Sequence, residues 1–166
     1  MRKSLGILLY RFSHHSQTGN REKKNLEVFL VHPGGPFFTK KDKGAWSIPK
    51  GLGEETEREI DAARREFAEE TGHNLNAPEK DFIDLGEVKQ KGGKIVRCFA
   101  IEGDLPGNYT HNSNTFEMEW PPKSGKKTEF PEADQAEFFS LEEASGKINP
   151  AQKEFLDRLL EKIEGA

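Results

Sequence analysis

Short apolar runs separated by polar segments dominate the first third of the chain. Two of these runs occupy residues 4–11 and 26–32, and the polar segment between them contains the turn-forming pair Gly19-Asn20. Because runs of this length bounded by turn residues are typical of β-strands, the pattern predicts a hairpin with a long exposed loop. A shorter apolar run at 45–48, stopped by a proline, predicts a brief third strand.

The spacing of apolar residues changes to that of a helix after residue 55. Thr56 and Glu59 have the spacing of a capping box, in which the threonine caps the helix and the glutamate bonds back to it. Gly72 is the kind of residue that ends a helix in the left-handed conformation. We therefore expect a helix over 57–71. Its apolar stripe consists of Ile60, Ala63, Phe67 and Thr71.

The second half of the chain predicts further strands and a C-terminal helix. Segment 121–127 is rich in proline, glycine and lysine and predicts a loop. Ser140 and Glu143 form a second capping box, and Asn149 caps a last helix whose first residue is Pro150. The predicted strands are 82–88, 94–101, 115–120 and 137–139.

Length, composition and charge restrict the domain organisation and the binding partners of this chain. The chain has 166 residues and a net charge of -4, without a repeat or a domain linker, so residues 1–166 are expected to form a single domain. The mild acidic excess argues against binding to nucleic-acid polymers or to an anionic membrane, because both require a basic surface.

Cysteine content and apolar run length bear on localisation. Cys98 is the single cysteine, so an internal disulfide is excluded and a cytoplasmic protein is expected. The basic and apolar start of the chain resembles an export signal weakly, but it lacks a small-residue cleavage site and is expected to be a strand. No run approaches the roughly 18 apolar residues of a transmembrane helix.

The acidic side chains are concentrated in one segment. Residues 54–70 hold eight acidic and three basic side chains. The net charge of this segment is therefore -5, which is more negative than the -4 of the whole chain. Glu66, Glu69 and Glu70 share one side of the expected helix, beside its apolar stripe. Each like-charge pair about 6 Å apart costs roughly 3 kcal/mol at an effective dielectric constant of about 20.

Two interpretations of this helix are open from its residues alone. A divalent cation such as Mg²⁺ would relieve the repulsion, since it prefers oxygen ligands and is commonly held by carboxylates together with substrate phosphates. Alternatively, the glutamates form a solvated face on which Arg65 and Glu69 make an ordinary surface ion pair.

The three glutamates belong to a longer pattern of residue types and spacings around the helix. This pattern is filled by Gly51, Glu57, Arg65, Glu66, Phe67, Glu69, Glu70 and Gly72. It resembles the Nudix box, and the segment 46–50 is similar to the approach to that box in many members of the family. One position departs from the pattern, because His73 stands where a bulky apolar residue is usual.

The resemblance implies an α+β protein with a Nudix-type α/β/α sandwich around a mixed β-sheet. It also implies hydrolysis of a nucleoside diphosphate linked to another moiety.

The resemblance assigns roles to individual residues. Glu66, Glu69 and Glu70 match the carboxylates that bind the metal and take part in catalysis, with Mg²⁺ as the cofactor and Mn²⁺ as a substitute. The carbonyl of Gly51 is an additional metal ligand, Arg65 and Glu57 orient the carboxylates, and Glu57 and Gly72 complete the structure of the box.

The identity of the general base stays open between a box glutamate and a carboxylate from a downstream loop. Alignment of the late strand with the family places Glu132 at the position of an additional metal-binding or basic carboxylate. Glu129 is the second choice.

The substrate is expected to be a small nucleotide. Lys50, Trp46 and Lys126 are the predicted substrate-binding residues, and a lysine-rich pair of loops favours a long polyphosphate. The approach to the box is similar to that of dinucleoside tetraphosphate hydrolases, so a nucleoside triphosphate or a dinucleoside polyphosphate is expected. Candidates for stacking on a base are Phe37, Tyr109 and Trp120.

Two other functions and two oligomeric states stay open. A nucleotide-sensing module would bind without cleaving, but it would not need every box carboxylate. A prenyl-diphosphate isomerase shares the box, and Cys98 gives this alternative weak support. Monomer and dimer are both compatible with the sequence.

Overall fold

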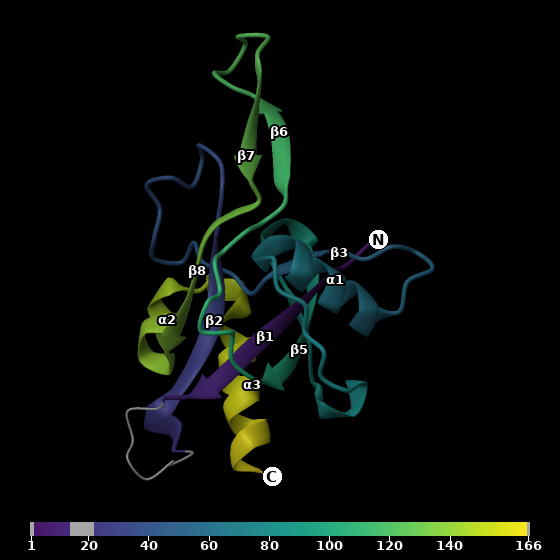
Figure 1. The fold of residues 1–166 in the computed structure, drawn as a ribbon, viewed down its shortest axis with the longest axis vertical. Helices are drawn as coiled ribbons and strands as arrows, with labels where there is room; N and C mark the ends of the chain where they lie inside the picture. The colour runs from purple at the N-terminus through teal and green to yellow at the C-terminus, as the bar shows by residue number, and fades with distance from the viewer. Residues whose placement is uncertain (1, 14–21, 166) are drawn as a thin grey trace.

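A six-stranded mixed sheet forms the centre of the computed structural model, which describes residues 2–13 and 22–165 (Figure 1). The predicted Gly19-Asn20 turn lies outside these residues. The strand order is β4-β5-β1-β2-β8, and β3 pairs with β1. The pairing of β1 with β5 is parallel and the other pairings are antiparallel. The strands are β1 (Ser4–Phe12), β2 (Leu26–Pro33), β3 (Lys50–Leu52), β4 (Ile83–Lys89), β5 (Ile95–Glu102) and β8 (Ala133–Ser140).

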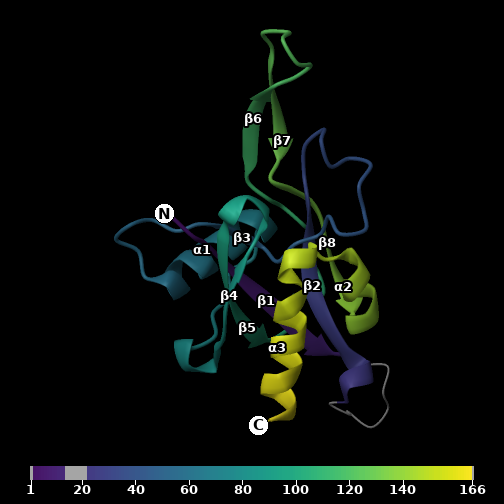
Figure 2. The same cartoon turned by 180° about the vertical axis from the view of Figure 1, so that it is seen from behind.

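Helices cover both faces of this sheet. Helix α1 (Glu59–Thr71) packs on one face against Leu5, Ile7 and Leu9 of β1. Helix α3 (Lys153–Glu164) packs on the other face against residues that include Leu8, and α2 (Leu141–Lys147) lies on that side as well (Figure 2). Strand β1 is almost entirely apolar because successive side chains enter the two opposite cores. The predicted α+β fold with a mixed sheet and an α/β/α arrangement is confirmed.

A two-stranded hairpin projects from this body (Figure 1). Strand β6 (Thr115–Glu119) confirms the predicted strand, but its partner β7 (Lys127–Pro131) was not predicted and begins at the end of the predicted loop. The sequence of β7 is mostly polar and has no apolar run. Its strand conformation depends on pairing with β6, which a local pattern does not reveal.

The predicted strand at 45–48 is wrong. Ser47 and Trp46 make only single bridges, to Val31 and to Ile148. The backbone N–H of Ile48 donates 3.0 Å to the side-chain carbonyl of buried Gln152, so a side chain replaces a strand partner there. The short strand β3 follows instead.

The two predicted capping boxes have different outcomes. Helix α1 begins at Glu59 with Arg58 as the N-cap and no side-chain cap, so Thr56 does not cap it. At α2 the Ser140 hydroxyl accepts from the backbone N–H of Glu143 at 3.2 Å, as predicted. At the end of α1, Gly72 adopts a left-handed φ of 78° and donates its N–H to Ala68, which confirms the predicted stop.

The C-terminal helix also has its predicted start. The Asn149 side chain accepts a hydrogen bond from the backbone N–H of Ala151 at 2.9 Å, and Pro150 opens a short 3-10 turn that leads into α3. Within the described ranges, no helix combines the length and apolarity needed to cross a bilayer.

The free energy of unfolding distinguishes the capping box that forms, at Ser140, from the one that does not, at Thr56. Ser140→Ala removes a cap hydrogen bond and should lower the free energy of unfolding by about 1 kcal/mol. Thr56→Ala removes no cap and should change it by less than about 0.5 kcal/mol. Urea unfolding of both variants compares them, and an equal loss of stability would contradict the assignment of the caps.

Candidate active site

The predicted carboxylates converge on a cleft of about 400 Å³ between α1, β3 and the base of the β6–β7 hairpin. Glu132, which lies between β7 and β8, lines the same cleft although it is more than sixty positions from the helix in sequence. The lining residues are Lys50, Gly51, Leu52, Glu66, Glu69, Glu70, Phe116 and Glu132.

Arg65 holds the helix carboxylates in place. Its Nε and Nη2 atoms donate to both oxygens of Glu57 at 2.8 and 2.9 Å, which is a bidentate pair. Its Nη1 atom donates to Glu66 at 2.8 Å and to Glu69 at 3.2 Å. The bonds to Glu57 raise the pKa of the guanidinium and lower the pKa of Glu57. Arg65 thus connects Glu57 with two of the box carboxylates, and the orienting role of Arg65 and Glu57 stays a prediction.

Gly51 lies directly against the carboxylate of Glu66. A Cβ atom at position 51 would overlap both carboxylate oxygens of Glu66, so no other residue fits without moving that side chain. Strand β3 brings Gly51 to this place by pairing with β1, where Gly51 is opposite Leu5. The close approach gives a physical reason for glycine at this position.

Four carboxyl groups line the cleft beside a single lysine side chain. Burial raises the pKa of Glu70 to about 8, and burial together with the charge of Glu69 raises the pKa of Glu66. Burial and Glu69 also raise the pKa of Glu132. The backbone N–H of Lys50 donates to Glu70 at 3.2 Å, and burial lowers the pKa of the Lys50 ammonium.

The donor chemistry of the cleft fits a hard divalent cation. Its titratable acceptors are all carboxylates, with neither imidazole nor thiol among the lining residues. The described side chains do not form a ready-made cluster of three metal ligands. Glu66 and Glu69 face Arg65, and Glu70 faces the Lys50 amide, so binding a cation requires these carboxylates to exchange partners.

A run of backbone hydrogen bonds places Glu132 in the cleft. Asn114 donates its N–H to the Glu69 carbonyl at 2.7 Å and accepts from the Glu132 N–H at 2.8 Å. The Glu132 carbonyl accepts from Gly34 at 3.0 Å, where a Cβ atom would overlap the Pro131 carbonyl. Glu129 is exposed on β7 opposite Glu117, outside the cleft, so the structure favours Glu132 of the two candidates.

Two of the predicted substrate-binding residues do not reach the cleft. Trp46 is only 3% exposed, its indole donates to Asp42 at 2.8 Å, and its ring packs against Phe139, so its predicted contact with substrate is corrected to a core role. Lys126 lies in the turn at the far end of the β6–β7 hairpin (Figure 1). Lys50 is present as predicted.

Three cleft residues were missed from the sequence. Leu52 and Phe116 line the cleft, and Asn114 connects Glu69 with Glu132. The alternation of apolar residues in 115–120 shows that Phe116 shares a face with Met118 and Trp120, but not that this face meets the cleft. Asn114 acts through its backbone, so its residue type carries no signal.

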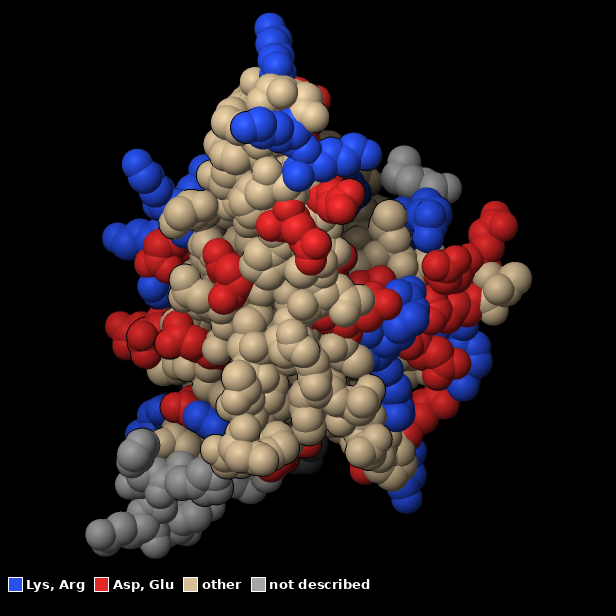
Figure 3. Space-filling model, turned by 45° about the horizontal axis from the view of Figure 1, so that its top comes forward, with Lys and Arg blue, Asp and Glu red and all other residues tan. Residues whose placement is uncertain are grey.

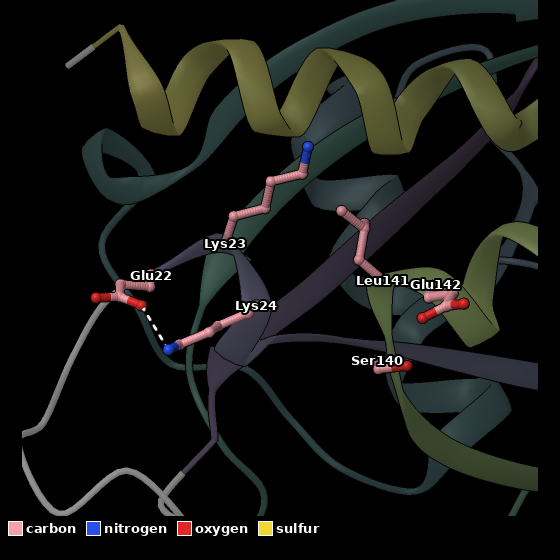
Figure 4. A pocket seen from close by; sticks show the side chains of 6 residues that line it. All are labelled: Glu22, Lys23, Lys24, Ser140, Leu141 and Glu142. Atoms are coloured by element: carbon pink, nitrogen blue, oxygen red, sulfur yellow. Dashed lines mark ion pairs between the residues drawn. The ribbon is translucent and has the colours of Figure 1, made fainter.

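A larger cavity of about 590 Å³ lies at the other end of β2 (Figure 4). The only ion pair shown among its lining residues joins Lys24 to Glu22 at 3.1 Å, and both side chains are largely exposed. Size alone therefore does not identify the active site, whereas convergent and perturbed carboxylates do. The lining residues are Glu22, Lys23, Lys24, Ser140, Leu141 and Glu142.

Comparison with known proteins identifies the family of this chain. The family model of the NUDIX domain matches residues 18–159. The chain belongs to the Nudix family. No curated protein matches it significantly.

Solved Nudix structures share the fold over nearly the full chain at low sequence identity. A binary complex of Ap4A hydrolase from C. elegans has a TM-score of 0.62 at 18% identity, covering 100% of both chains. A mutT/nudix family protein from Listeria innocua has a TM-score of 0.61 at 17% identity, covering 99% of this chain and 94% of that one. The NUDIX domain of Shewanella oneidensis NrtR, complexed with ADP ribose, has a TM-score of 0.60 at 13% identity, covering 96% and 86%. At these identities, the feature shared with the three structures is the fold.

The contact between Gly51 and Glu66 can be tested by adding one methyl group. Gly51→Ala should displace the Glu66 carboxylate and weaken Mn²⁺ binding by about tenfold or more, measured by titration calorimetry. Gly146→Ala is the matched control, because a Cβ atom there meets nothing within 4 Å. Equal Mn²⁺ affinity in both variants would contradict the proposed dependence on Gly51.

Proposed function

We propose that this Nudix protein hydrolyses a phosphoanhydride bond in a nucleoside diphosphate linked to another moiety, with Mg²⁺ or Mn²⁺ as cofactor. Its substrate is a nucleoside triphosphate or a dinucleoside polyphosphate. The observation that carries this proposal is the convergence of Glu132 with Glu66, Glu69 and Glu70 in one cleft, although Glu132 comes from a distant part of the chain.

The relatives are consistent with a nucleotide substrate. One is named as an Ap4A hydrolase, and another was solved in complex with ADP ribose. Both ligands contain a nucleoside diphosphate joined to a further group, which is the chemical class proposed for this chain.

Glu66, Glu69, Glu70 and the Gly51 carbonyl would hold the metal. When bound, the metal would neutralise phosphate oxygens and make a water molecule more acidic. Arg65, which is fixed by its bonds to Glu57, holds Glu66 and Glu69 beside the cleft until a cation replaces the guanidinium as their partner.

The remaining cleft residues act on the substrate and the attacking water. Glu132 accepts a proton from this water as general base, because it is the cleft carboxylate that makes no bond to Arg65 or to the Lys50 amide. Lys50 pairs with a phosphate oxygen, because its partly buried ammonium lies in the same cleft and benefits from a further negative partner. Leu52 and Phe116 cover the apolar side of the cleft.

The isomerase alternative is disfavoured by the position of Cys98. The thiol is completely buried in the core beneath the sheet, and burial raises its pKa. It does not line the carboxylate cleft, so it could not act on a substrate there. A nucleotide-sensing module would bind the same ligands without releasing products.

Removing one metal ligand should abolish most of the activity. Glu66→Gln or Glu70→Gln should lower kcat at least roughly a hundredfold, or about 3 kcal/mol in the barrier, because each removes a charged ligand. The assay uses Mg²⁺ with nucleoside triphosphates, dinucleoside polyphosphates, nucleotide sugars and NADH, and identifies the products. Far-ultraviolet circular dichroism verifies that the variants fold. Near-normal rates in both variants would contradict the metal assignment, and binding without turnover by the wild type would favour the sensing module.

A matched pair of variants tests the assignment of the general base. Glu132→Gln should lower kcat at neutral pH by at least roughly a hundredfold and change the pH profile, because the proton acceptor is lost. Glu129→Gln, an exposed residue of the adjacent strand, should leave both unchanged. The assignment to Glu132 fails if the two variants have the same pH–rate profile.

A further inference from the structure

The β6–β7 hairpin presents one apolar face. Phe116 and Met118 of β6, and Trp120 directly after its end, alternate with the exposed Thr115, Glu117 and Glu119, so the three apolar side chains share a face. Phe130 extends this face on β7, where it pairs with Phe116 across the strands and their rings lie 6.0 Å apart. All four side chains are only partly buried.

A loop that follows β2 lies opposite this face. Its residue Phe37 packs edge-on against Trp120, with ring centroids 5.7 Å apart, and Gly35 lies against the ring of Phe116. Phe37 remains 61% exposed despite this contact. The loop itself is anchored, because buried His32 bonds to the Lys41 carbonyl at 2.6 Å and to Asp134 at 2.8 Å.

The aromatic pair Phe37–Trp120 is continuous with the carboxylate cleft. Phe116 lines the cleft, and Trp120 lies four strand residues further along the same face, about 13 Å away. Among the described residues, the exposed large hydrophobic side chains are Phe37, Phe38 and Leu52, which lie in this loop or in the cleft. Exposed apolar surface concentrated around one cleft is typical of a ligand site.

Positive charge accompanies the distal end of the hairpin. Lysines gather at its tip, as Figure 3 shows, whereas Glu117 and Glu119 lie on the opposite, exposed face of β6. An aromatic pair next to lysines suits a ligand with a flat base and phosphates. The tip lysines are Lys123, Lys126 and Lys127.

We propose that the Phe37–Trp120 pair forms a second nucleobase subsite for the end of the substrate remote from the carboxylates. Because the two rings meet edge-on, one of them stacks on this base and the other contacts its edge. This inference rests on the proposed function and narrows it to dinucleoside polyphosphates. Such a substrate reaches from the cleft, past Phe116, to the distal base, where the lysines of the hairpin tip are close by. A nucleoside triphosphate that lacks a second base leaves the subsite empty.

Fluorescence tests the stacking directly and without turnover. The chain has two tryptophans, and Trp46 is buried whereas Trp120 is partly exposed. Titration of the metal-free protein with diadenosine tetraphosphate should quench the emission, and Trp120→Phe should abolish the quenching because only buried Trp46 still emits. Absence of quenching in the wild type, or equal quenching in the variant, would overturn the subsite.

Kinetics test the assignment to the second base. Trp120→Leu and Phe37→Ala should each raise KM for diadenosine tetraphosphate about tenfold, with kcat little changed. KM for adenosine tetraphosphate, which has the same number of phosphates and one base, should not change. Phe38→Ala is the matched control, because its ring faces Lys41 and not Trp120.

The possible results separate the subsite from the proposed function. Equal KM increases for both nucleotides, or an increase in Phe38→Ala as large as in Phe37→Ala, would overturn the second-base assignment. If no nucleotide is hydrolysed at all, the proposed function fails, and the fluorescence titration still decides whether the Phe37–Trp120 pair binds a base.

Discussion

The bidentate pair between Arg65 and Glu57 is the interaction on which the site depends. It fixes the segment before α1 to the middle of that helix, and Arg65 also reaches the Leu52 carbonyl beside the cleft. Because Glu57 is engaged with Arg65, it stays outside the helix, which starts two residues later than its pattern predicts. The same guanidinium offsets the repulsion between Glu66 and Glu69, which would otherwise oppose helix formation at this spacing.

The rest of the fold brings distant segments to this fixed helix. Apolar side chains on both faces of β1 hold α1 against one side of the sheet and α3 against the other. Strand β3 then places Gly51 against Glu66, and backbone bonds through Asn114 connect Glu69 to Glu132. These hydrogen bonds join main-chain groups of α1 to the segments that flank the β6–β7 hairpin, so they fix the backbone of Glu132 relative to the helix.

Charge distinguishes the carboxylate cleft from the larger cavity. Burial raises the pKa of three carboxyl groups in the cleft, so their ionised forms are disfavoured until a cation compensates their charge. A divalent cation would compensate the charge of the carboxylates in this cleft. The polyphosphate would pair with Lys50. The β6–β7 hairpin extends the same surface with aromatic and basic groups.

The sequence by itself determined the end of α1, because a glycine after a helical pattern is a local signal. Its resemblance to the Nudix box indicated the family and the sandwich fold and pointed to the box carboxylates. The tertiary structure decided the rest. It moved Trp46 into the core, formed β7 by pairing with β6, and chose Glu132 over Glu129 for the cleft. Each of these outcomes depends on contacts between residues far apart in the chain, and such contacts leave no signal in local spacing.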